Sequence, residues 1–248
     1  MLPTLTIIGV PGLPEVRPGD DLAQLIIDAC QDPGRDGSHG PGVGPGLEQH
    51  DVLVVSQKVV SKAEGKLVKV DPGDPQSHKP LVLAESARVV RRRGDLIISE
   101  TKHGFVCASA GIDRSNVEAD TAALLPDDPD RSARRIRDAI SGRLGLRVAV
   151  IVADTFGRPW RRGLTDVAIG SAGILPVLDL RGSGDALGRE LQVTEVCIVD
   201  ELAGAAELVR GKATGIAVAI VRGVDPAWFG EGSVVAGIVR PPSEDLFR

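Results

Sequence analysis

Short runs of aliphatic residues, each ending in polar residues or glycine, set the strongest limit on the fold of this chain. Clear examples are DVLVVS at 51–56, VAVIVA at 148–153 and IAVAIVRG at 216–223. Runs of this length suit buried β-strands and are far shorter than the roughly 20 apolar residues of a membrane-spanning helix. We therefore expect buried strands and no segment that crosses a membrane.

The shortage of aromatic residues indicates what surrounds these strands. The 248 residues include four Phe, two Trp and no Tyr, although hydrophobic residues make up 42% of the chain. A core built from Val, Ile, Leu and Ala is typical of sheets covered by helices. The length fits one large domain or two small ones, and the sequence has no internal repeat or clean linker. Any second lobe is therefore expected to be interleaved with the first.

Hydrophobic periodicity predicts that strands and helices alternate along the chain. We expect strands at 4–10, 51–56, 147–154, 191–200, 216–223 and 233–239, with further strands within 95–110. We expect helices at about 22–30, 80–93, 128–144 and 201–210, the last closed by Gly211. Residues 31–50 are rich in Gly, Pro, Asp and Ser, which predicts a surface loop insert.

The net charge and the N-terminus restrict the partners and the location. The net charge of −5 argues against a surface that coats nucleic acid or an anionic membrane. No basic residue precedes Arg17, so the charged start of a signal peptide is missing. Cys30, Cys107 and Cys197 are far apart and odd in number, which favours reduced thiols. We expect a cytoplasmic protein without nucleic-acid or membrane partners.

Three clusters of polar residues follow apolar strands, where side chains can project into a cleft at the edge of a sheet. The first, SQKVVSK at 56–62, places Lys58 and Lys62 beside hydroxyl groups. It lacks the GxxxxGK[ST] spacing of a Walker loop. Either a contact with phosphate oxygens or a solvated turn explains this segment.

The other two clusters supply oxygen ligands. CASAGIDRSN at 107–116 offers Asp113 and Asn116, and VADTFGRPWRRG at 152–163 offers Asp154, Thr155 and a group of arginines that includes Arg158. Two separated aspartates and a threonine suit Mg²⁺ or Mn²⁺ when phosphates and waters complete the coordination shell. Each segment alone can also be a capping turn, but the presence of both favours a metal site that handles phosphates.

Other reaction classes find less support in the sequence. It has no GxSxG motif and no histidines at zinc-ligand spacing, and no nucleophile with its base can be picked out. These features favour metal-assisted phosphoryl chemistry over acyl-enzyme chemistry. RGKATG at 210–215 is either a nucleotide-contacting turn or a plain helix C-cap.

Taken together and in order, six segments resemble the coenzyme F420-0:L-glutamate ligase family. They are GLPEVRPGDDL, VVSQKVVSKAEGK, AGIDRSN, VADTFGRPWRRG with TDVAIGSAG, ELQVTEVCIVDELAGAAELVRGK and AVAIVRG. The resemblance implies an α+β fold particular to the family, with mixed α and β elements in two lobes, and a homodimer. It implies GTP-dependent addition of L-glutamate to coenzyme F420-0, then of γ-linked glutamates, through an acyl phosphate with release of GDP and phosphate.

The same resemblance implies Mg or Mn, as one or two ions, and potassium. Asp113 and Asp154 would hold one metal ion, Thr155 would help to hold a second, and Arg158 would help to clamp anionic groups. The nucleotide would contact Leu13, Pro14, Glu15, Val16, Ser56, Gln57, Lys62 and Asn116, and the turn Arg210, Gly211, Lys212, Ala213, Thr214, Gly215, Ile216 and Ala217. Some members carry an acidic or amide ligand for the second ion in this turn, where this chain has Lys212 and Thr214.

Some relatives continue into a flavin-binding reductase domain, whereas this chain ends at Leu246, Phe247 and Arg248. We therefore expect residues 1–248 to form a single ligase unit without a C-terminal reductase domain. Two alternatives use the same residues. A metal-dependent nucleotide phosphohydrolase would release phosphate without glutamate, and a non-catalytic GTP-binding protein would bind the nucleotide without turnover.

Overall fold

The computed structural model describes residues 3–31 and 46–245. Most of the loop insert expected at 31–50 therefore lies outside the described residues. Within the described ranges, no helix combines the length and the apolar character needed to cross a membrane. Helices and several sheets are both present, which confirms the predicted α+β class.

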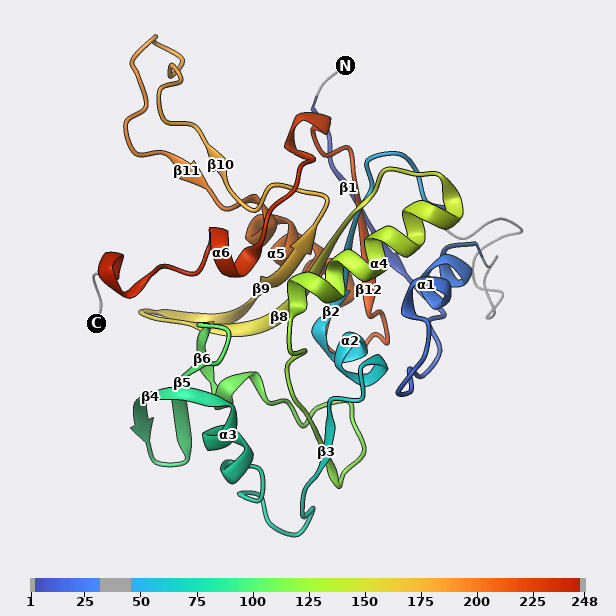
Figure 1. Cartoon of the computed structure of the whole chain (residues 1–248), viewed down its shortest axis with the longest axis vertical. Helices are drawn as coiled ribbons and strands as arrows, with labels where there is room; N and C mark the ends of the chain where they lie inside the picture. The colour runs from blue at the N-terminus through green and yellow to red at the C-terminus, as the bar shows by residue number, and fades with distance from the viewer. Residues whose placement is uncertain (1–2, 32–45, 246–248) are drawn as a thin grey trace.

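A five-stranded sheet forms the centre of the molecule (Figure 1). Its strand order is β1 (Thr6–Val10), β12 (Val218–Arg222), β2 (Val52–Ser56), β8 (Ala149–Arg158) and β9 (Arg161–Ala172). Neighbouring strands are antiparallel except for β2 and β8, which are parallel. Because Ser56 pairs with Ala153, the polar residues that follow β2 lie beside Asp154 at the same end of the sheet.

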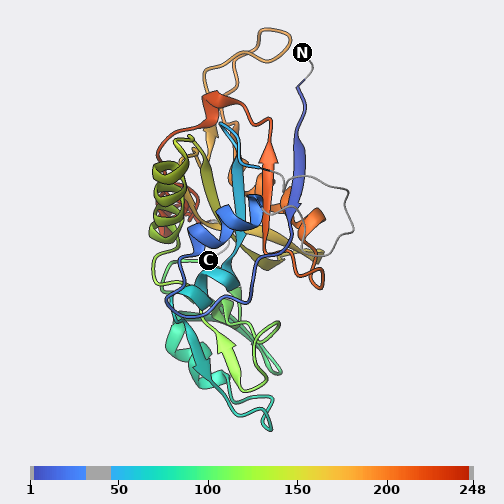
Figure 2. The ribbon, with the colours of Figure 1, turned by 90° about the vertical axis from the view of Figure 1, so that its right-hand side faces the viewer.

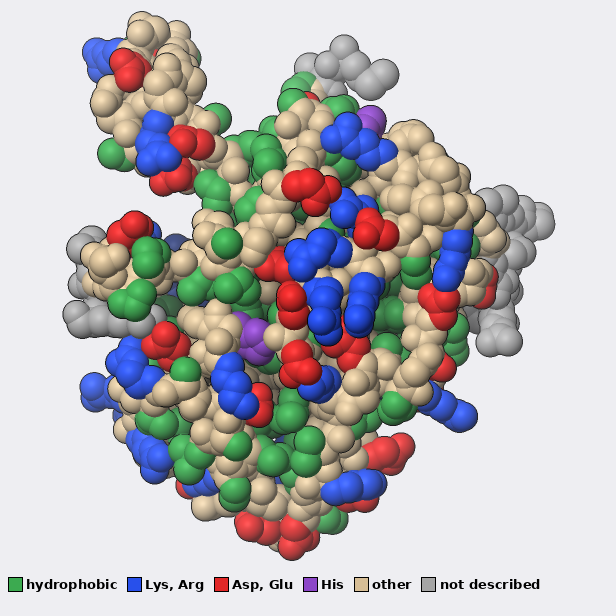
Figure 3. All heavy atoms as spheres, in the orientation of Figure 1, with side chains coloured by type: hydrophobic (Ala, Val, Ile, Leu, Met, Phe, Trp, Pro, Cys, Tyr) green, Lys and Arg blue, Asp and Glu red, His purple; other side chains and the backbone are tan. Residues whose placement is uncertain are grey.

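Helices cover both faces of this sheet (Figures 1 and 2). The helices α1 (Leu22–Gln31) and α4 (Pro129–Leu144) lie on one face, and α5 (Ile198–Arg210) crosses the other. The aliphatic runs seen in the sequence form the core between these layers, with Leu53, Ile151 and Ile220 fully buried. On the outer face around α4, basic and acidic side chains are interspersed (Figure 3).

A smaller group of elements lies below the sheet in Figure 1 and has a separate aliphatic cluster that includes Val82 and Ile97. The short helix α2 (Gln57–Ala63) leads into it from β2. Its elements are β3 (Leu67–Lys69), α3 (Lys79–Glu85), β4 (Ser86–Arg93), β5 (Leu96–Thr101), β6 (Val106–Ala108), the 3₁₀ turn η1 (Ser109–Gly111) and β7 (Thr121–Ala123). The chain then returns to the main sheet through α4.

The helix expected at 80–93 is wrong in its second half. Residues Ser86–Arg93 form strand β4, which pairs antiparallel with β5. The turn between them contains Gly94 at φ +57°, and Arg88 bonds to Glu100 across the pair with a distance of 3.2 Å. The β-branched Val89 and the cross-strand partners therefore outweigh the helical spacing of the apolar residues.

Two expected strands near the C-terminus are also wrong. Within 191–200 only β11 (Glu195–Val196) is a strand, paired with β10 (Leu178–Asp179), and α5 begins at Ile198. Residues 233–239 contain the short helix α6 (Val234–Gly237) instead of a strand. The buried Asp130 carboxylate accepts hydrogen bonds from the Val234 backbone and the Ser233 hydroxyl, which fixes this turn. The short turns η2 (Pro226–Trp228) and η3 (Pro242–Glu244) flank α6.

Candidate functional site

A cleft of about 900 Å³ opens where the polar ends of β2 and β8 meet the smaller group of elements. The parallel pairing of these two strands explains the position of the cleft, because the residues that follow Ser56 and Ala153 lie at the same edge of the sheet. Segments from α2, the loop after η1, β9, and the end of α5 with its following turn complete the walls. The cleft thus gathers segments from distant parts of the sequence.

Most of the residues that sequence analysis assigned to a site line this cleft. They are Glu15, Ser56, Gln57, Lys62, Asp113, Asn116, Asp154, Thr155, Arg210, Gly211, Lys212, Ala213, Gly215, Ile216 and Ala217. All three strand-end clusters and the turn after α5 are therefore represented in one cavity. This shared location is the property that a common binding site requires.

The structure places the remaining five assigned residues outside the lining. Val16 is a core residue with 4% exposure, and Leu13 packs against the same core. Pro14 is exposed beside them. Arg158 lies in the exposed end of the β8–β9 hairpin and donates to the Arg162 carbonyl. The Thr214 hydroxyl donates to the Arg210 carbonyl and so stabilises the turn after α5.

Asp113 and Asp154 face the cleft in different electrostatic settings. The Lys58 ammonium lies 2.9 Å from Asp113 Oδ2, and the Ser115 backbone N–H donates to Asp113 Oδ1 at 2.6 Å. Asp154 receives one hydrogen bond among the described residues, from the Thr155 backbone N–H at 2.8 Å. One carboxylate is therefore paired with a cation, and the other is not.

This difference separates the pKa values of the two acids. Burial raises the pKa of Asp154 to about 7, with a smaller contribution from the nearby Asp113 and Asp166 carboxylates, while the Thr155 hydrogen bond and the Lys58 ammonium act in the opposite direction. Burial also acts on the pKa of Asp113, but the Ser115 hydrogen bonds and the Lys58 ammonium outweigh it and hold that pKa below its usual range. A group of high pKa beside a second carboxylate is typical of a site that binds a cation.

A second charged cluster lies beside Thr155. The Thr155 hydroxyl donates to Asp166 Oδ1 at 2.5 Å and accepts a hydrogen bond from the Lys212 ammonium. The other Asp166 oxygen pairs with Arg210, and both of these side chains are almost fully buried. The Lys212 ammonium also lies 3.1 Å from Glu207 Oε1. Two carboxylates and two cations therefore balance each other in this cluster.

Sequence analysis assigned no role to Asp166 or Glu207, and it indicated Lys58 only as one of two lysines that can contact phosphate oxygens. Asp166 stands in the segment TDVAIGSA as a charged residue before an apolar run, and a charge buried in a strand is unusual unless it is paired. The position of Asp166 in a strand-like segment could therefore have indicated a buried, paired carboxylate. Glu207 shows no comparable signal, because an acidic residue on a helix is ordinarily a solvated one.

Of the α2 residues, Gln57 stabilises the fold, whereas Lys62 presents a charge to the cleft. The Gln57 amide donates to the Leu124 carbonyl at 2.9 Å and to the Ser61 hydroxyl, so it holds α2 against the smaller group of elements. Lys62, only 8% exposed, pairs with the exposed Glu15 at 2.5 Å. Its partner comes from the loop before α1, so an anion can replace Glu15 without loss of a buried contact.

The donor set fits a hard divalent cation. Among the described residues no group of three or more His, Cys, Asp and Glu side chains is arranged to hold a metal by itself. Asp113 and Asp154 instead offer two carboxylates on one cleft, and within residues 3–31 and 46–245 Asp154 forms no ion pair. Mg²⁺ commonly binds to one or two carboxylates while phosphates and waters supply its other ligands.

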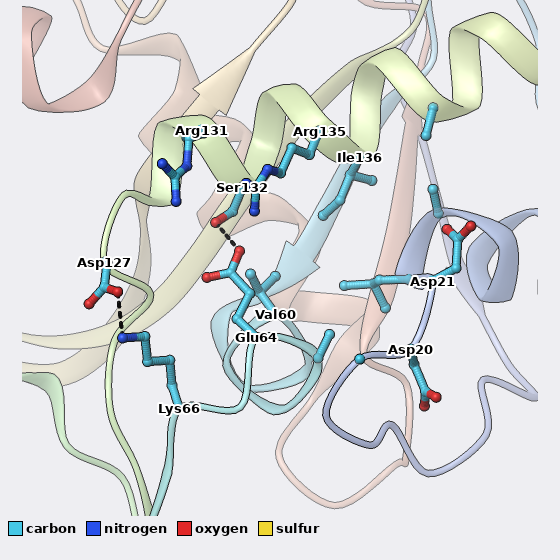
Figure 4. Close-up of a pocket in the computed structure, with 15 residues that line it drawn as sticks. Asp20, Asp21, Val60, Glu64, Lys66, Asp127, Arg131, Ser132, Arg135 and Ile136 are labelled. Carbon is cyan, nitrogen blue, oxygen red and sulfur yellow. Dashed lines mark hydrogen bonds and ion pairs between the residues drawn. The ribbon is translucent and has the colours of Figure 1, made fainter.

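A second cavity of about 500 Å³ lies on the other side of α2, between α1 and α4 (Figure 4). Its lining includes none of the residues that sequence analysis assigned to a site. Ser132 bonds to Glu64 and Lys66 pairs with Asp127, each at 2.5 Å. These paired groups link the residues between α2 and β3 to α4 and to the loop that precedes it.

Comparisons with known proteins all point to one family. A family model described as F420-0:Gamma-glutamyl ligase matches residues 12–223. A protein named Coenzyme F420:L-glutamate ligase from Methanothermobacter thermautotrophicus is 40% identical over 259 residues, with 98% of this chain and 99% of that protein covered. The protein of the same name from Methanopyrus kandleri is 41% identical over 264 residues, covering 100% and 99%. That from Methanocaldococcus jannaschii is 40% identical over 217 residues, covering 82% and 86%.

Proposed function

Because this chain belongs to the F420-0:gamma-glutamyl ligase family and is a ligase enzyme of coenzyme F420 biosynthesis, we propose that it couples GTP cleavage to the addition of L-glutamate to coenzyme F420-0. The product would be F420-1, followed by γ-linked polyglutamyl F420, with release of GDP and phosphate. Relatives that cover almost the whole chain at about 40% identity support the ligase activity.

One observation carries the assignment of the chemistry to the cleft. Asp113 and Asp154 are far apart in the sequence, yet both line the same cavity, and the Asp113 carboxylate contributes to the raised pKa of Asp154. An ionised carboxylate that is withdrawn from water beside a second carboxylate is costly unless a cation neutralises it. A divalent ion between these groups and the phosphates of a nucleotide removes that cost.

The proposed reaction forms an amide in two steps. The acceptor carboxylate of F420-0 attacks the γ-phosphorus of GTP, the bond to the β-phosphate oxygen breaks, and an acyl phosphate and GDP result. The glutamate nitrogen, after losing a proton, then attacks the acyl carbon and displaces phosphate. Activation is necessary because a free carboxylate has no adequate leaving group.

The protein would position the phosphates and neutralise their charge. Lys58 and Lys62 both end in the cleft and are held by carboxylates that phosphate oxygens can replace. The turn after α5, with Gly211 and Gly215, adds backbone to the same lining. A magnesium or manganese ion held by Asp113 and Asp154 would supply Lewis-acid stabilisation of the β- and γ-phosphate oxygens.

Potassium as a second cofactor, a homodimeric assembly and a cytoplasmic location belong to the same proposal. They rest on the family resemblance. Guanine as the base rests on it as well.

A reconstitution tests the proposed function. The protein is incubated with GTP, Mn²⁺, L-glutamate and F420-0, each component is omitted in turn, and the deazaflavin product is weighed by mass spectrometry. We expect mass gains of whole glutamate units only in the complete mixture, together with GDP. Phosphate release without glutamate would indicate a nucleotide phosphohydrolase, and GTP binding without turnover would indicate a non-catalytic GTP-binding protein.

A further inference from the structure

The Lys212 ammonium is enclosed by oxygen atoms from three different elements. It contacts the Thr155 hydroxyl of β8, lies 3.5 Å from Asp166 Oδ1 of β9 and lies 3.1 Å from Glu207 Oε1 of α5. Two carboxylates and a hydroxyl around one position are the kind of oxygen ligands that a divalent cation takes. Here a lysine side chain occupies that position.

The charges of the two clusters differ. In the cluster of Asp166, Glu207, Arg210 and Lys212, two negative groups face two positive groups. Around Asp113 and Asp154, the Lys58 ammonium faces two carboxylates and forms its ion pair with Asp113. A divalent ion thus relieves the repulsion between Asp113 and Asp154. In the cluster of Asp166, Glu207, Arg210 and Lys212 it would instead meet a set of groups that is already neutral.

The turn that carries Lys212 is held in place from both sides. The Thr214 hydroxyl donates to the Arg210 carbonyl, and the Asn116 amide donates to the Lys212 carbonyl at 3.4 Å. The side chain is 61% exposed, so it is not packed into the core and its position is set by the three oxygens. Replacing it changes the local charge without removing buried apolar contacts.

We propose that Lys212 takes the place of a second divalent ion, so that this enzyme holds one divalent ion per active site where Thr155 would otherwise bind another. The inference rests on the proposed function, because it assumes that Asp113 and Asp154 hold the first ion. Lys212 acts here as a positioning residue that fixes Thr155 and Asp166 through charge. The Lys212 ammonium therefore supplies positive charge that a second divalent ion would otherwise bring to the site.

Counting bound ions tests this inference. The intact protein is dialysed to equilibrium against Mn²⁺ and a non-hydrolysable GTP analogue, and the manganese and nucleotide retained per chain are measured. We expect one manganese per nucleotide in the native protein and in Lys212→Arg, which keeps a cation. In Lys212→Gln, which adds an amide oxygen, and in Lys212→Met, which keeps the length without charge, we expect two.

A matched control is Lys66→Gln, which removes a lysine at the second cavity, paired with Asp127 (Figure 4), and should leave the ratio at one. Two manganese ions per nucleotide in the native protein would overturn this inference while leaving the proposed function intact. A ratio of one in both Lys212→Gln and Lys212→Met would do the same. Absence of both nucleotide and manganese from the native protein would overturn the proposed function and, with it, this inference.

Discussion

The ammonium group of Lys58 lies 2.9 Å from Oδ2 of Asp113, and this contact joins the first turn of α2 to the loop after η1. It also leaves the nearby Asp154 without a cation partner among the described residues. Before any ligand binds, Asp113 therefore forms an ion pair, whereas Asp154 accepts only the hydrogen bond from the Thr155 backbone. The first three predictions below follow from this asymmetry.

Asp154→Asn removes the unpartnered carboxylate and keeps the shape of the side chain. We expect kcat/KM for glutamate addition to fall by roughly 10²-fold or more, because a metal ligand that stabilises charge in the transition state is lost. The measurement is GDP formation in a coupled assay with F420-0 and glutamate. Asp127→Asn, an exposed aspartate at the second cavity, is the matched control and should keep native activity. Native turnover by Asp154→Asn would remove the metal assignment.

Asp154 also makes the stability of the metal-free protein depend on pH. Its pKa is raised from 3.8 to about 7, so the folded state holds a proton there that the unfolded state has lost. Its contribution to the free energy of unfolding is therefore largest below about pH 4 and declines as the pH rises to about 7. Asp154→Asn should lack this decline and be the more stable protein above about pH 7, by about 1 kcal/mol or more.

Because several other aspartates have lowered pKa values, the informative quantity is the difference between native protein and Asp154→Asn at each pH. Urea denaturation in the presence of a chelator measures it. A difference that is independent of pH between about pH 4 and 7 would contradict the raised pKa of Asp154.

Manganese affinity should fall as the pH is lowered through about 7. Below that pH a proton occupies Asp154 and competes with the ion, so the apparent dissociation constant should rise by up to about tenfold per pH unit. Titration of the protein with Mn²⁺ at constant nucleotide, followed by electron paramagnetic resonance, measures the free ion. An affinity that stays constant between about pH 5 and 7 would argue against Asp154 as a ligand.

The Asp166–Arg210 ion pair should contribute strongly to stability, since both residues are at most 3% exposed. Among the described residues, Arg210→Met leaves the buried Asp166 carboxylate with the Thr155 hydroxyl and, as its one cation, Lys212, and we expect the free energy of unfolding to fall by about 3–5 kcal/mol. The exposed Arg143–Asp21 pair offers a comparison, and Arg143→Met should lower the free energy of unfolding much less, because water screens this pair. Equal losses in the two variants, measured by denaturant titration, would contradict the role assigned to burial.

Gly170 allows α4 to approach the central sheet. A Cβ atom at this position would lie 2.3 Å from the carbonyl carbon of Pro129, a backbone atom that cannot move aside cheaply. We expect Gly170→Ala to lower the free energy of unfolding by about 1–3 kcal/mol through overpacking. Gly142→Ala, with open space around its Cβ inside the same helix, should raise it by about 0.5–1 kcal/mol. Thermal unfolding that ranks Gly170→Ala above Gly142→Ala would contradict this account of the packing.

The errors in the predicted elements share a physical cause. At 86–93 the spacing of apolar residues permits a helix, but pairing with β5 selects a strand. At 233–239 a β-branched run predicts a strand, but the Asp130 carboxylate caps a helical turn there. In both segments the deciding partner is distant in the sequence, and local propensity is too weak to resist it.

The sequence by itself determined the aliphatic strands, their polar ends, the family and most of the residues that line the cleft. These features are local or are carried by whole motifs, so the order of residues is sufficient to reveal them. Only the tertiary structure decided that Asp113 and Asp154 share a cavity, that Lys58 serves one of them, and that Lys212 sits among the oxygens of Thr155, Asp166 and Glu207. Those relationships depend on distances between segments, which are set when the parallel β2–β8 pair and the helices on either face pack into one core.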